Sequence, residues 1–370
     1  MTTYLLTGGG TAGHVNPLLA VADRIRETDP DATLLVLGTK EGLEARLVPS
    51  RGYELLTIAR LPFPRRPDRA ALAFPAGFRR AVDEVAAIIR ERHVDIVVGF
   101  GGYASAPAYR AASRTKTPLV IHEQNARPGL ANRLGALSTP FVGVAFRHTR
   151  LRGARFVGQP LRVEIERLDR FEGRKAGISF FGLDSAKPTL LVTGGSSGAQ
   201  RINETVRDSI TLVLGAGWQV IHITGEFRDA VDDPNLPGYL IVKYCDRMEL
   251  ALAVADVALG RAGTSTVAEV TALGIPAVFV PYAAGNGEQR LNAREDVAAG
   301  GAIAVADADF TPAWVGDTLV SLLRDRARIA DMAMRAATVG ALDGTDRMVA
   351  LVREALAGGS AHEPYSAAGD

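Results

Sequence analysis

The chain has 370 residues, of which 47% are hydrophobic and 22% are charged, a globular composition that is long enough for two domains with separate cores. This composition excludes a disordered, a collagen-like or a disulfide-rich chain. The 42 Lys and Arg residues against 41 Asp and Glu give a net charge of +1, so no attraction to nucleic acid is expected from the overall charge.

Two further features bear on the cellular compartment. The single cysteine, Cys245, cannot form an intramolecular disulfide, which is typical of a reducing cytosol. The longest stretches without a charge, residues 1–22 and 270–287, are interrupted by glycine and proline, so neither a signal peptide nor a membrane span is expected. We therefore expect a soluble protein that can still contact a membrane surface.

Short apolar runs alternate with amphipathic segments from the start of the chain. The runs predict strands at 4–7, 33–37, 53–58, 95–99, 119–122 and 141–145. From Pro188 the pattern restarts and predicts strands at 189–193, 219–224, 239–244, 257–259 and 277–280. Alternation of buried strands and helices is typical of parallel α/β sheets, so we predict an α/β fold with two Rossmann-like domains.

The boundary between the two halves is expected within residues 155–174, where Gly158, Pro160 and a charge-dense stretch follow the last strand of the first half. The predicted parts are an N-terminal domain over 1–157, a C-terminal domain over 158–345, a last helix over 346–358 and a tail over 359–370. We expect the last helix to return toward the N-terminal domain. The small and polar composition of the tail predicts disorder.

The first strand leads into Gly8-Gly9-Gly10-Thr11-Ala12-Gly13, which fits G-x-G-x-x-G between a strand and a helix. Its backbone N–H groups are suited to a pyrophosphate at the N-terminus of that helix. A nicotinamide cofactor would need an acidic residue at the end of the second strand, and Glu41 comes one step too late. A turn that serves only packing would not explain His14 and Asn16 in the same turn, and we expect no cofactor.

Residues 60–80 form the most basic segment, with six Arg, one acid (Asp68) and a local net charge of +5. Four prolines predict an exposed loop with apolar tips rather than a long helix. Such a surface suits anionic lipid headgroups. The predicted docking residues are Phe63, Arg65, Arg66, Arg69, Leu72, Phe74 and Phe78. The alternative is that the aromatic residues pack into the core and the Arg residues form a solvated face.

Polar residues also follow two later strands of the first half. Gly101, Gly102 and Tyr103 belong to a second glycine turn, and His122, Glu123, Gln124 and Asn125 follow the next strand. Open α/β sheets bind ligands at the carboxyl ends of their strands, so these residues favour the lining of a cleft. A purely structural role for such turn residues stays open.

The second half carries its own glycine turn, Gly194–Gly198, which also fits the G-x-S-x-G pattern of a hydrolase nucleophile. A hydrolase needs an acid and then a histidine after the serine, and only His222 and His362 follow, one on an early strand and one in the tail. A loop that cradles phosphate needs neither residue and agrees with the glycine turn of the first half. The six histidines lie far apart in the sequence, so no metal site is expected.

Residues 261–269 follow a strand and begin a helix with three hydroxyl side chains, those of Thr264, Ser265 and Thr266. Free N–H groups and hydroxyls at a helix start suit a phosphate, and Glu269 can accept hydrogen bonds from two ribose hydroxyls. The alternative is a capping box with Thr266 as N-cap and Glu269 at the third helical position. A second polar run nearby, residues 285–292, favours the ligand site.

Taken in order, the motifs GGTAGH, GGYASAP, HEQN, GGSSGAQRIN, RAGTSTVAE and GNGEQRLNA resemble those of the MurG family, over residues 3–357. The resemblance implies two GT-B domains that face each other across a cleft. It also implies the inverting transfer of N-acetylglucosamine from UDP-N-acetylglucosamine to the 4-hydroxyl of the muramoyl sugar of lipid I, which forms lipid II for peptidoglycan. The enzyme would lie in the cytoplasm, peripherally on the inner face of the cell membrane, with an anionic membrane surface as a partner.

The same resemblance assigns roles to individual residues. It implies that Thr11, Ala12 and Gly13 line the cleft, Asn125 contacts the donor sugar, and Arg162 and Ser196 hold the diphosphate. It further implies that the backbone at Cys245 meets uracil, Thr264, Ser265 and Thr266 take phosphate, Glu269 takes the ribose and Gln289 takes the N-acetylglucosamine hydroxyls. Gly101, Gly102 and Tyr103 are expected on the acceptor side. The chain departs from the family at Gln159 and Glu288, where Asn and Gln are usual.

His14 is the best candidate for the base that deprotonates the acceptor hydroxyl, because imidazole titrates near neutral pH and the residue lies on the first glycine turn. Glu123 is the rival candidate. A structural alternative for His14 is to cap the following helix or to hold Asn16. Other classes stay open as well: a GT-B lipid galactosyltransferase, a UDP-N-acetylglucosamine 2-epimerase, or a non-catalytic nucleotide-binding module.

Overall fold

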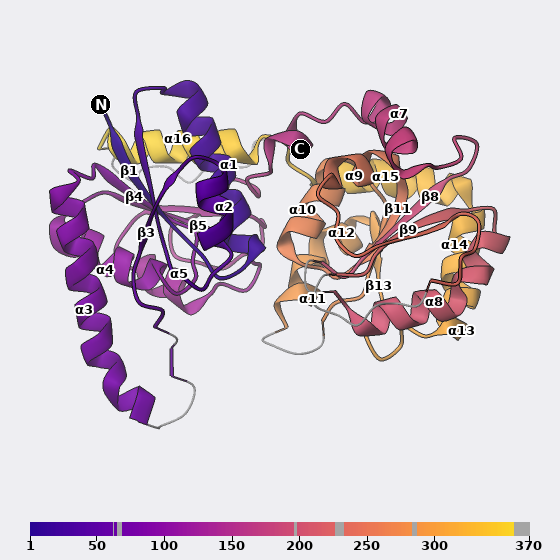
Figure 1. Cartoon of the computed structure of the whole chain (residues 1–370), viewed down its shortest axis with the longest axis horizontal. Coiled ribbons are helices and arrows are strands. Elements are labelled where there is room, and N and C mark those ends of the chain that lie inside the picture. Colours follow the sequence, from indigo (N-terminus) through magenta and orange to yellow (C-terminus); the bar gives the residue numbers. More distant parts are fainter. Residues whose placement is uncertain (62, 65–68, 196–197, 226–232, 283–286, 359–370) are drawn as a thin grey trace. The chain divides into compact units, whose positions relative to one another are not determined.

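The structure, a computed structural model, describes residues 1–61, 63–64, 69–195, 198–225, 233–282 and 287–358 (Figure 1). The chain divides into two compact units. Unit 1 comprises Met1–Arg162 and the chain from Asp343 on, and unit 2 comprises Val163–Leu342. The chain thus crosses between units after Arg162 and after Leu342, whereas the sequence places the domain boundaries after residues 157 and 345. The tail expected to be disordered, 359–370, lies outside the described residues.

Unit 1 is built on a parallel sheet of seven strands in the order β3-β2-β1-β4-β5-β6-β7. The strands are β1 (Thr3–Thr7), β2 (Thr33–Gly38), β3 (Glu54–Thr57), β4 (Ile96–Gly99), β5 (Leu119–Glu123), β6 (Phe141–Val144) and β7 (Ala154–Phe156). The helices are α1 (Ala12–Thr28), α2 (Glu44–Ser50), α3 (Arg69–Glu91), α4 (Ser105–Thr115), α5 (Leu130–Gly135) and α16 (Gly344–Leu356).

The sheet of unit 1 is covered on both faces. Successive side chains of a strand point to opposite faces, so Leu5 belongs to the core packed with α3 and α4, while Leu6 belongs to the core packed with α1 and α16. Both leucines are fully buried. Burial on two faces is the physical reason that the strands are continuous apolar runs in the sequence.

Unit 2 repeats this architecture with six parallel strands in the order β10-β9-β8-β11-β12-β13. The strands are β8 (Thr189–Thr193), β9 (Gln219–Ile223), β10 (Tyr239–Val242), β11 (Ala255–Gly260), β12 (Ala277–Phe279) and β13 (Ala302–Ala304). The helices are α6 (Val163–Glu166), α7 (Arg170–Phe181), α8 (Gln200–Gly215), α9 (Met248–Val254), α10 (Thr264–Ala272), α11 (Glu288–Asn292), α12 (Arg294–Ala299), α13 (Pro312–Trp314), α14 (Val320–Arg324) and α15 (Arg326–Val339), with a π-helical turn at Val315–Leu319. The predicted pair of parallel-sheet α/β domains is confirmed.

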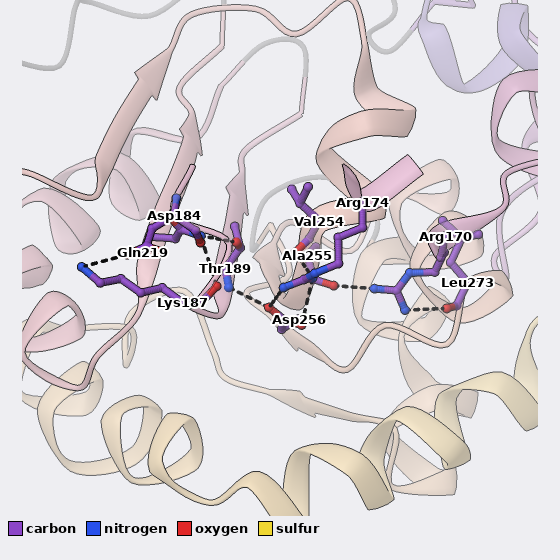
Figure 2. A network of polar contacts seen from close by, with 10 residues as sticks. All are labelled: Arg170, Arg174, Asp184, Lys187, Thr189, Gln219, Val254, Ala255, Asp256 and Leu273. Atoms are coloured by element: carbon purple, nitrogen blue, oxygen red, sulfur yellow. Dashed lines mark hydrogen bonds and ion pairs between the residues drawn. The ribbon is translucent and has the colours of Figure 1, made fainter. Parts of the chain in front are cut away.

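Polar contacts attach α7 to the amino-terminal ends of the strands in this second sheet (Figure 2). The Asp256 carboxylate accepts hydrogen bonds from the Thr189 N–H at 2.7 Å and from the Arg174 guanidinium at 3.2 Å. Arg170 donates to the carbonyl oxygens of Ala255 at 2.6 Å and Leu273 at 3.2 Å. These groups satisfy backbone atoms near the amino ends of the strands, and ligands of open parallel sheets bind at the opposite, carboxyl ends.

Helix α16 belongs to unit 1 although it follows all of unit 2 in the sequence. Arg155 Nη1 and Glu354 Oε2 form an ion pair at 2.6 Å between β7 and α16. At the start of the helix, a Cβ atom on Gly344 would lie 2.5 Å from the carbonyl oxygen of Gln159. The two segments that cross between the units therefore touch each other within unit 1, and only glycine fits at this contact.

The basic segment 60–80 differs from its prediction. Its prolines predict a loop, yet α3 begins at Arg69 and continues through Pro75 to Glu91. A proline inside a helix removes one backbone hydrogen bond. Farther along α3, Val82 and Val85 pack into the core of unit 1, and this burial outweighs the loss. The expectation of a loop is therefore wrong for residues 69–80.

Strands β7 and β13 have no counterpart in the sequence prediction. Each has three residues and forms the last strand of its sheet. Edge strands are exposed on one side, so they need no continuous apolar run. Pattern reading depends on such runs, and for that reason it misses both.

Candidate functional site

Three turns of unit 1 follow the neighbouring strands β1, β4 and β5 at the carboxyl edge of the sheet. The first two turns touch, because a Cβ atom on Gly102 would lie 2.6 Å from the carbonyl oxygen of Gly9. Gly10, Gly101 and Gly102 adopt φ angles of +91°, +81° and +90°, which are open to glycine and strained for other residues. Glycine is thus required here both by the conformation and by the close approach of two backbones.

His14 lies in the first turn of α1, beside these two glycine turns. Its Nδ1 is 3.0 Å from Thr11 Oγ1, and a Cβ atom on Gly101 would lie 3.4 Å from its Cδ2. Desolvation lowers the pKa of His14, and the negative charge of Glu44 opposes that effect. In the tautomer whose Nδ1–H donates to Thr11, Nε2 is an acceptor, as a general base requires.

Glu123, the rival base, has both carboxylate oxygens engaged in its own loop. Oε1 accepts from the Asn125 N–H at 2.8 Å, and Oε2 accepts from the Gly129 N–H and from Asn132 Nδ2, each at 2.9 Å. The side chain is 2% exposed, and desolvation raises its pKa. A buried carboxylate with three donors is suited to holding the loop after β5 rather than to moving protons.

Asn132 and Tyr109 belong to this site, and the sequence analysis missed both. The Tyr109 hydroxyl donates to Asn132 Oδ1 at 2.7 Å and accepts from the Gly101 N–H at 3.2 Å. Together with the bond from Asn132 to Glu123, this chain links the second glycine turn to the loop after β5. Both residues lie within helices, α5 and α4, outside the turns whose polar residues the sequence marks in this unit.

Glu44 is the third residue that the sequence analysis missed. Its Oε2 accepts from the Gly10 N–H at 2.8 Å. Glu41 is the acid nearest the end of β2, whereas the acid that contacts the glycine turn is Glu44, the first residue of α2. An acidic residue at the start of the helix that follows β2 is the signal in the sequence that marks its position.

In unit 2, α10 begins at Thr264 with Gly263 as its N-cap. Thr264, Ser265 and Thr266 therefore occupy the first three helical positions, where backbone N–H groups have no partner within the helix. The capping box proposed as an alternative needs Thr266 as the N-cap, so that alternative is wrong. Glu269 lies on the same helix and is 8% exposed.

Helix α11 is tied to the start of α10. Asn292 Nδ2 donates to the Ala262 carbonyl at 3.2 Å and to Thr264 Oγ1 at 3.3 Å. Gln289 Oε1 accepts a hydrogen bond from the Tyr282 N–H at 2.9 Å. The two polar runs of the second half, which lie apart in the sequence, are thus brought together by hydrogen bonds.

The structure gathers the predicted site residues in two sets, one in each unit. The set in unit 1 is Thr11, Ala12, Gly13, His14, Gly101, Gly102, Tyr103, Glu123 and Asn125, and the set in unit 2 is Thr264, Ser265, Thr266, Glu269 and Gln289. Arg162 is the last residue of unit 1 before the crossing, and Cys245 follows β10 as a half-buried side chain. Ser196 lies outside the described residues.

The predicted docking residues lie at the start of α3 and just before it. The ring centroids of Phe63 and Phe74 are 5.1 Å apart with tilted planes, and those of Phe74 and Phe78 are 5.8 Å apart and stacked, so the three aromatic side chains form a cluster. Leu72 instead points outward and is 83% exposed. Arg69 begins the helix, and Arg65 and Arg66 lie outside the described residues.

The described residues also bear on two other kinds of site. No group of three or more His, Cys, Asp or Glu side chains in that part of the chain could hold a metal ion. None of its helices is long and apolar enough to span a membrane.

Two parallel-sheet α/β domains, each with a glycine turn after its first strand, are the architecture of GT-B glycosyltransferases. Comparison with known families agrees: the glycosyltransferase family 28 N-terminal domain matches residues 4–138, and the family 28 C-terminal domain matches residues 189–348. The chain belongs to glycosyltransferase family 28.

A protein of Leifsonia xyli subsp. xyli is 63% identical over 356 residues, which cover 96% of this chain and 99% of that protein. A Streptomyces coelicolor protein is 46% identical, covering 95% of this chain and 98% of its own. Both are named UDP-N-acetylglucosamine–N-acetylmuramyl-(pentapeptide) pyrophosphoryl-undecaprenol N-acetylglucosamine transferase. The crystal structure of Acinetobacter baumannii MurG matches with a TM-score of 0.77 and 26% identity, covering 96% of this chain and 100% of that chain. The resemblance to the MurG family is confirmed.

Proposed function

We propose that this chain transfers N-acetylglucosamine from UDP-N-acetylglucosamine to the 4-hydroxyl of the muramoyl sugar of lipid I, with inversion, to form lipid II. The observation that carries the proposal is 63% identity, over 96% of the chain, to a relative named as that transferase. The relative is covered over 99% of its own length, so both of its domains have counterparts here. The product would supply peptidoglycan synthesis, and through it cell wall growth, cell shape and division.

The donor belongs to unit 2 in this proposal. The N–H groups and hydroxyls at the start of α10 hold phosphate, because a helix N-terminus carries partial positive charge. Glu269 accepts hydrogen bonds from the ribose hydroxyls, and the Gln289 amide donates to the hydroxyls of the sugar. The remaining donor contacts, which rest on the family resemblance, are the backbone at Cys245 for uracil, Ser196 and Arg162 for the diphosphate, and Asn125 for the sugar.

The acceptor belongs to the glycine turns of unit 1, with Thr11, Ala12 and Gly13 on one side and Gly101, Gly102 and Tyr103 on the other. His14 Nε2 takes the proton of the 4-hydroxyl while that oxygen attacks the anomeric carbon of the donor. The bond from the anomeric carbon to UDP breaks in the same step, which inverts the configuration. The negative charge of the leaving diphosphate is met by the helix N-terminus and by Arg162.

A lipid-linked acceptor requires that the enzyme reach a membrane. We place the docking surface at Phe63, Arg65, Arg66, Arg69, Leu72, Phe74 and Phe78, with the enzyme peripheral on the cytoplasmic face. Each Arg near anionic headgroups contributes about 1 kcal/mol of attraction. An exposed leucine at the start of a helix adds an apolar contact that salt does not screen.

Release of UDP from UDP-N-acetylglucosamine, measured with and without a lipid I analogue in detergent, tests the proposal. We expect UDP release that depends on the analogue and a product that carries both sugars. A 2-epimerase would instead act on the donor equally well without the analogue. A nucleotide-binding module would release no UDP under either condition.

A further inference from the structure

The Glu44 carboxylate lies beneath the first glycine turn. Its Oε2 accepts from the Gly10 N–H at 2.8 Å, and its Oε1 accepts from the N–H and the Oγ1 of Thr39, each at 2.9 Å. The side chain is 1% exposed. Three donors from two separate turns therefore converge on one buried carboxylate, and such charge-assisted bonds are about twice as strong as bonds between neutral groups.

The backbone around Glu44 is shaped to this side chain. A Cβ atom on Gly9, Gly38 or Gly42 would collide with it. These glycines come from the turn after β1, the end of β2 and the loop before α2, so three segments close around the same carboxylate. The Gly10 N–H, which the G-x-G-x-x-G motif would offer to a pyrophosphate, is already bonded to the protein's own anion.

The turn that Glu44 holds is the one that presents the proposed base. Thr11 directly follows Gly10, and the Thr11 hydroxyl lies 3.0 Å from His14 Nδ1. Glu44 also raises the pKa of His14 against the lowering by desolvation. From α5, the Asn132 amide borders the same space above Gly101 as the His14 ring, but it is uncharged and donates to Glu123.

We propose that Glu44 is a positioning residue for the transfer reaction. It seats the first glycine turn so that Thr11 and His14 meet the acceptor, and its charge stabilises the imidazolium formed when His14 takes the acceptor's proton. The inference rests on the proposed function, in which His14 is the base.

The first test is a histidine NMR titration of the unliganded protein, which needs no substrate. Glu44→Gln keeps the size of the side chain and removes its charge, so the pKa of His14 should fall. Glu41→Gln removes an exposed acid from the same loop and should leave the pKa unchanged. If Glu44→Gln fails to fold, Thr39→Val takes its place in the kinetic test below. It removes one donor to Glu44 and should lower kcat, by less than the loss expected for Glu44→Gln.

The second test is kinetic. Glu44→Gln should lower kcat by about tenfold or more, because a small misplacement of a reacting group is costly, and it should keep the donor KM within about twofold. A variant that melts at a lower temperature but keeps the wild-type pKa of His14 and the wild-type pH profile of kcat would overturn the proposal and leave Glu44 a purely structural role. If the wild-type protein releases no UDP with the lipid I analogue while the NMR shift is present, the proposed function fails and the coupling of Glu44 to His14 stands.

Discussion

The environment of His14 favours a neutral imidazole at physiological pH, since desolvation lowers its pKa. A neutral imidazole is the form that accepts a proton, so kcat should rise with pH and then level off. The apparent pKa of this rise should lie below 6.5. His14→Ala should lower kcat by about 100-fold or more while the donor affinity is kept. His93→Ala, a change elsewhere in unit 1, serves as the control. If only donor binding falls, His14 positions the ligand and is not the base.

Glu269 provides a second prediction at the residue scale. The start of α10 at Thr264 removes the capping role for its carboxylate, and the side chain is nearly buried. Glu269→Ala should raise the donor KM by more than about tenfold, because the two charge-assisted hydrogen bonds proposed between its carboxylate and the ribose hydroxyls would be lost. Glu172→Gln on α7 changes an exposed acid of the same unit and should leave KM unchanged. An unchanged KM in the Glu269 variant would remove the residue from the ribose site.

Residue types in turns could be predicted from the sequence, but their hydrogen-bond partners could not. The glycine turns, His14 and the hydroxyl residues at the start of α10 follow from local patterns that need no tertiary contact. The role of Glu44 could not be predicted in this way, because its partner Gly10 lies in another segment, which the pairing of β1 with β2 brings near. Glu123 illustrates the converse case, in which the sequence suggests a catalytic role. Only the hydrogen-bond donors around its carboxylate, which the structure brings together, indicate a structural role.

At the scale of elements, α3 is helical where the prolines predict a loop. The charges at its start predict a membrane-docking surface. We expect Leu72→Ser to weaken the binding to anionic vesicles that persists at high salt, because an exposed leucine inserted into the interface contributes about 1.5–3 kcal/mol. Co-sedimentation with vesicles measures this. Leu212→Ser replaces an exposed leucine of α8 and should have no effect. If the Leu72 variant binds vesicles as well as the wild-type protein, the start of α3 is not part of the docking surface. If a protein with Arg65→Glu and Arg66→Glu still binds fully at low salt, the basic residues are not part of it either.

Central strands and short edge strands differ in how well the sequence predicts them. Strands β1, β4 and β8 are buried on both faces, so each is an apolar run that can be recognised without neighbours. β7 and β13 obtain their structure from the strand beside them. The helical course of α3 through Pro75 likewise depends on packing against the sheet, which no local pattern contains.

At the scale of the whole molecule, the repeated strand and glycine turn suffice to predict two α/β units. The points at which the chain crosses between them depend on contacts such as Gly344 against Gln159, which join residues far apart in the sequence. Because α16 completes the core of unit 1, the fold of that unit requires a segment that follows all of unit 2. Stability of the chain is therefore best followed unit by unit.

Asp296 in α12 makes the stability of unit 2 depend on pH. Its side chain is fully buried, neither carboxylate oxygen has a hydrogen-bond partner among the described residues, and desolvation raises its pKa to about 7. Between about pH 4 and 7 the folded state therefore binds one more proton than the unfolded state, so the free energy of unfolding falls as pH rises. The destabilisation caused by the buried, charged Asp296 carboxylate is absent below about pH 4 and fully present above about pH 7.

Asp296→Asn removes the titrating group and should stabilise unit 2 at pH 8 by up to about 4 kcal/mol, at 1.36 kcal/mol per pKa unit. In calorimetry this predicts a Tm higher by up to about 8–16 °C for the transition of unit 2 at pH 8, little change at pH 4, and an unchanged transition of unit 1. Asp309→Asn, an exposed site in the same unit, should leave both transitions in place. An equal gain at pH 4 and pH 8 would mean that improved packing, and not removal of a buried charge, accounts for the effect.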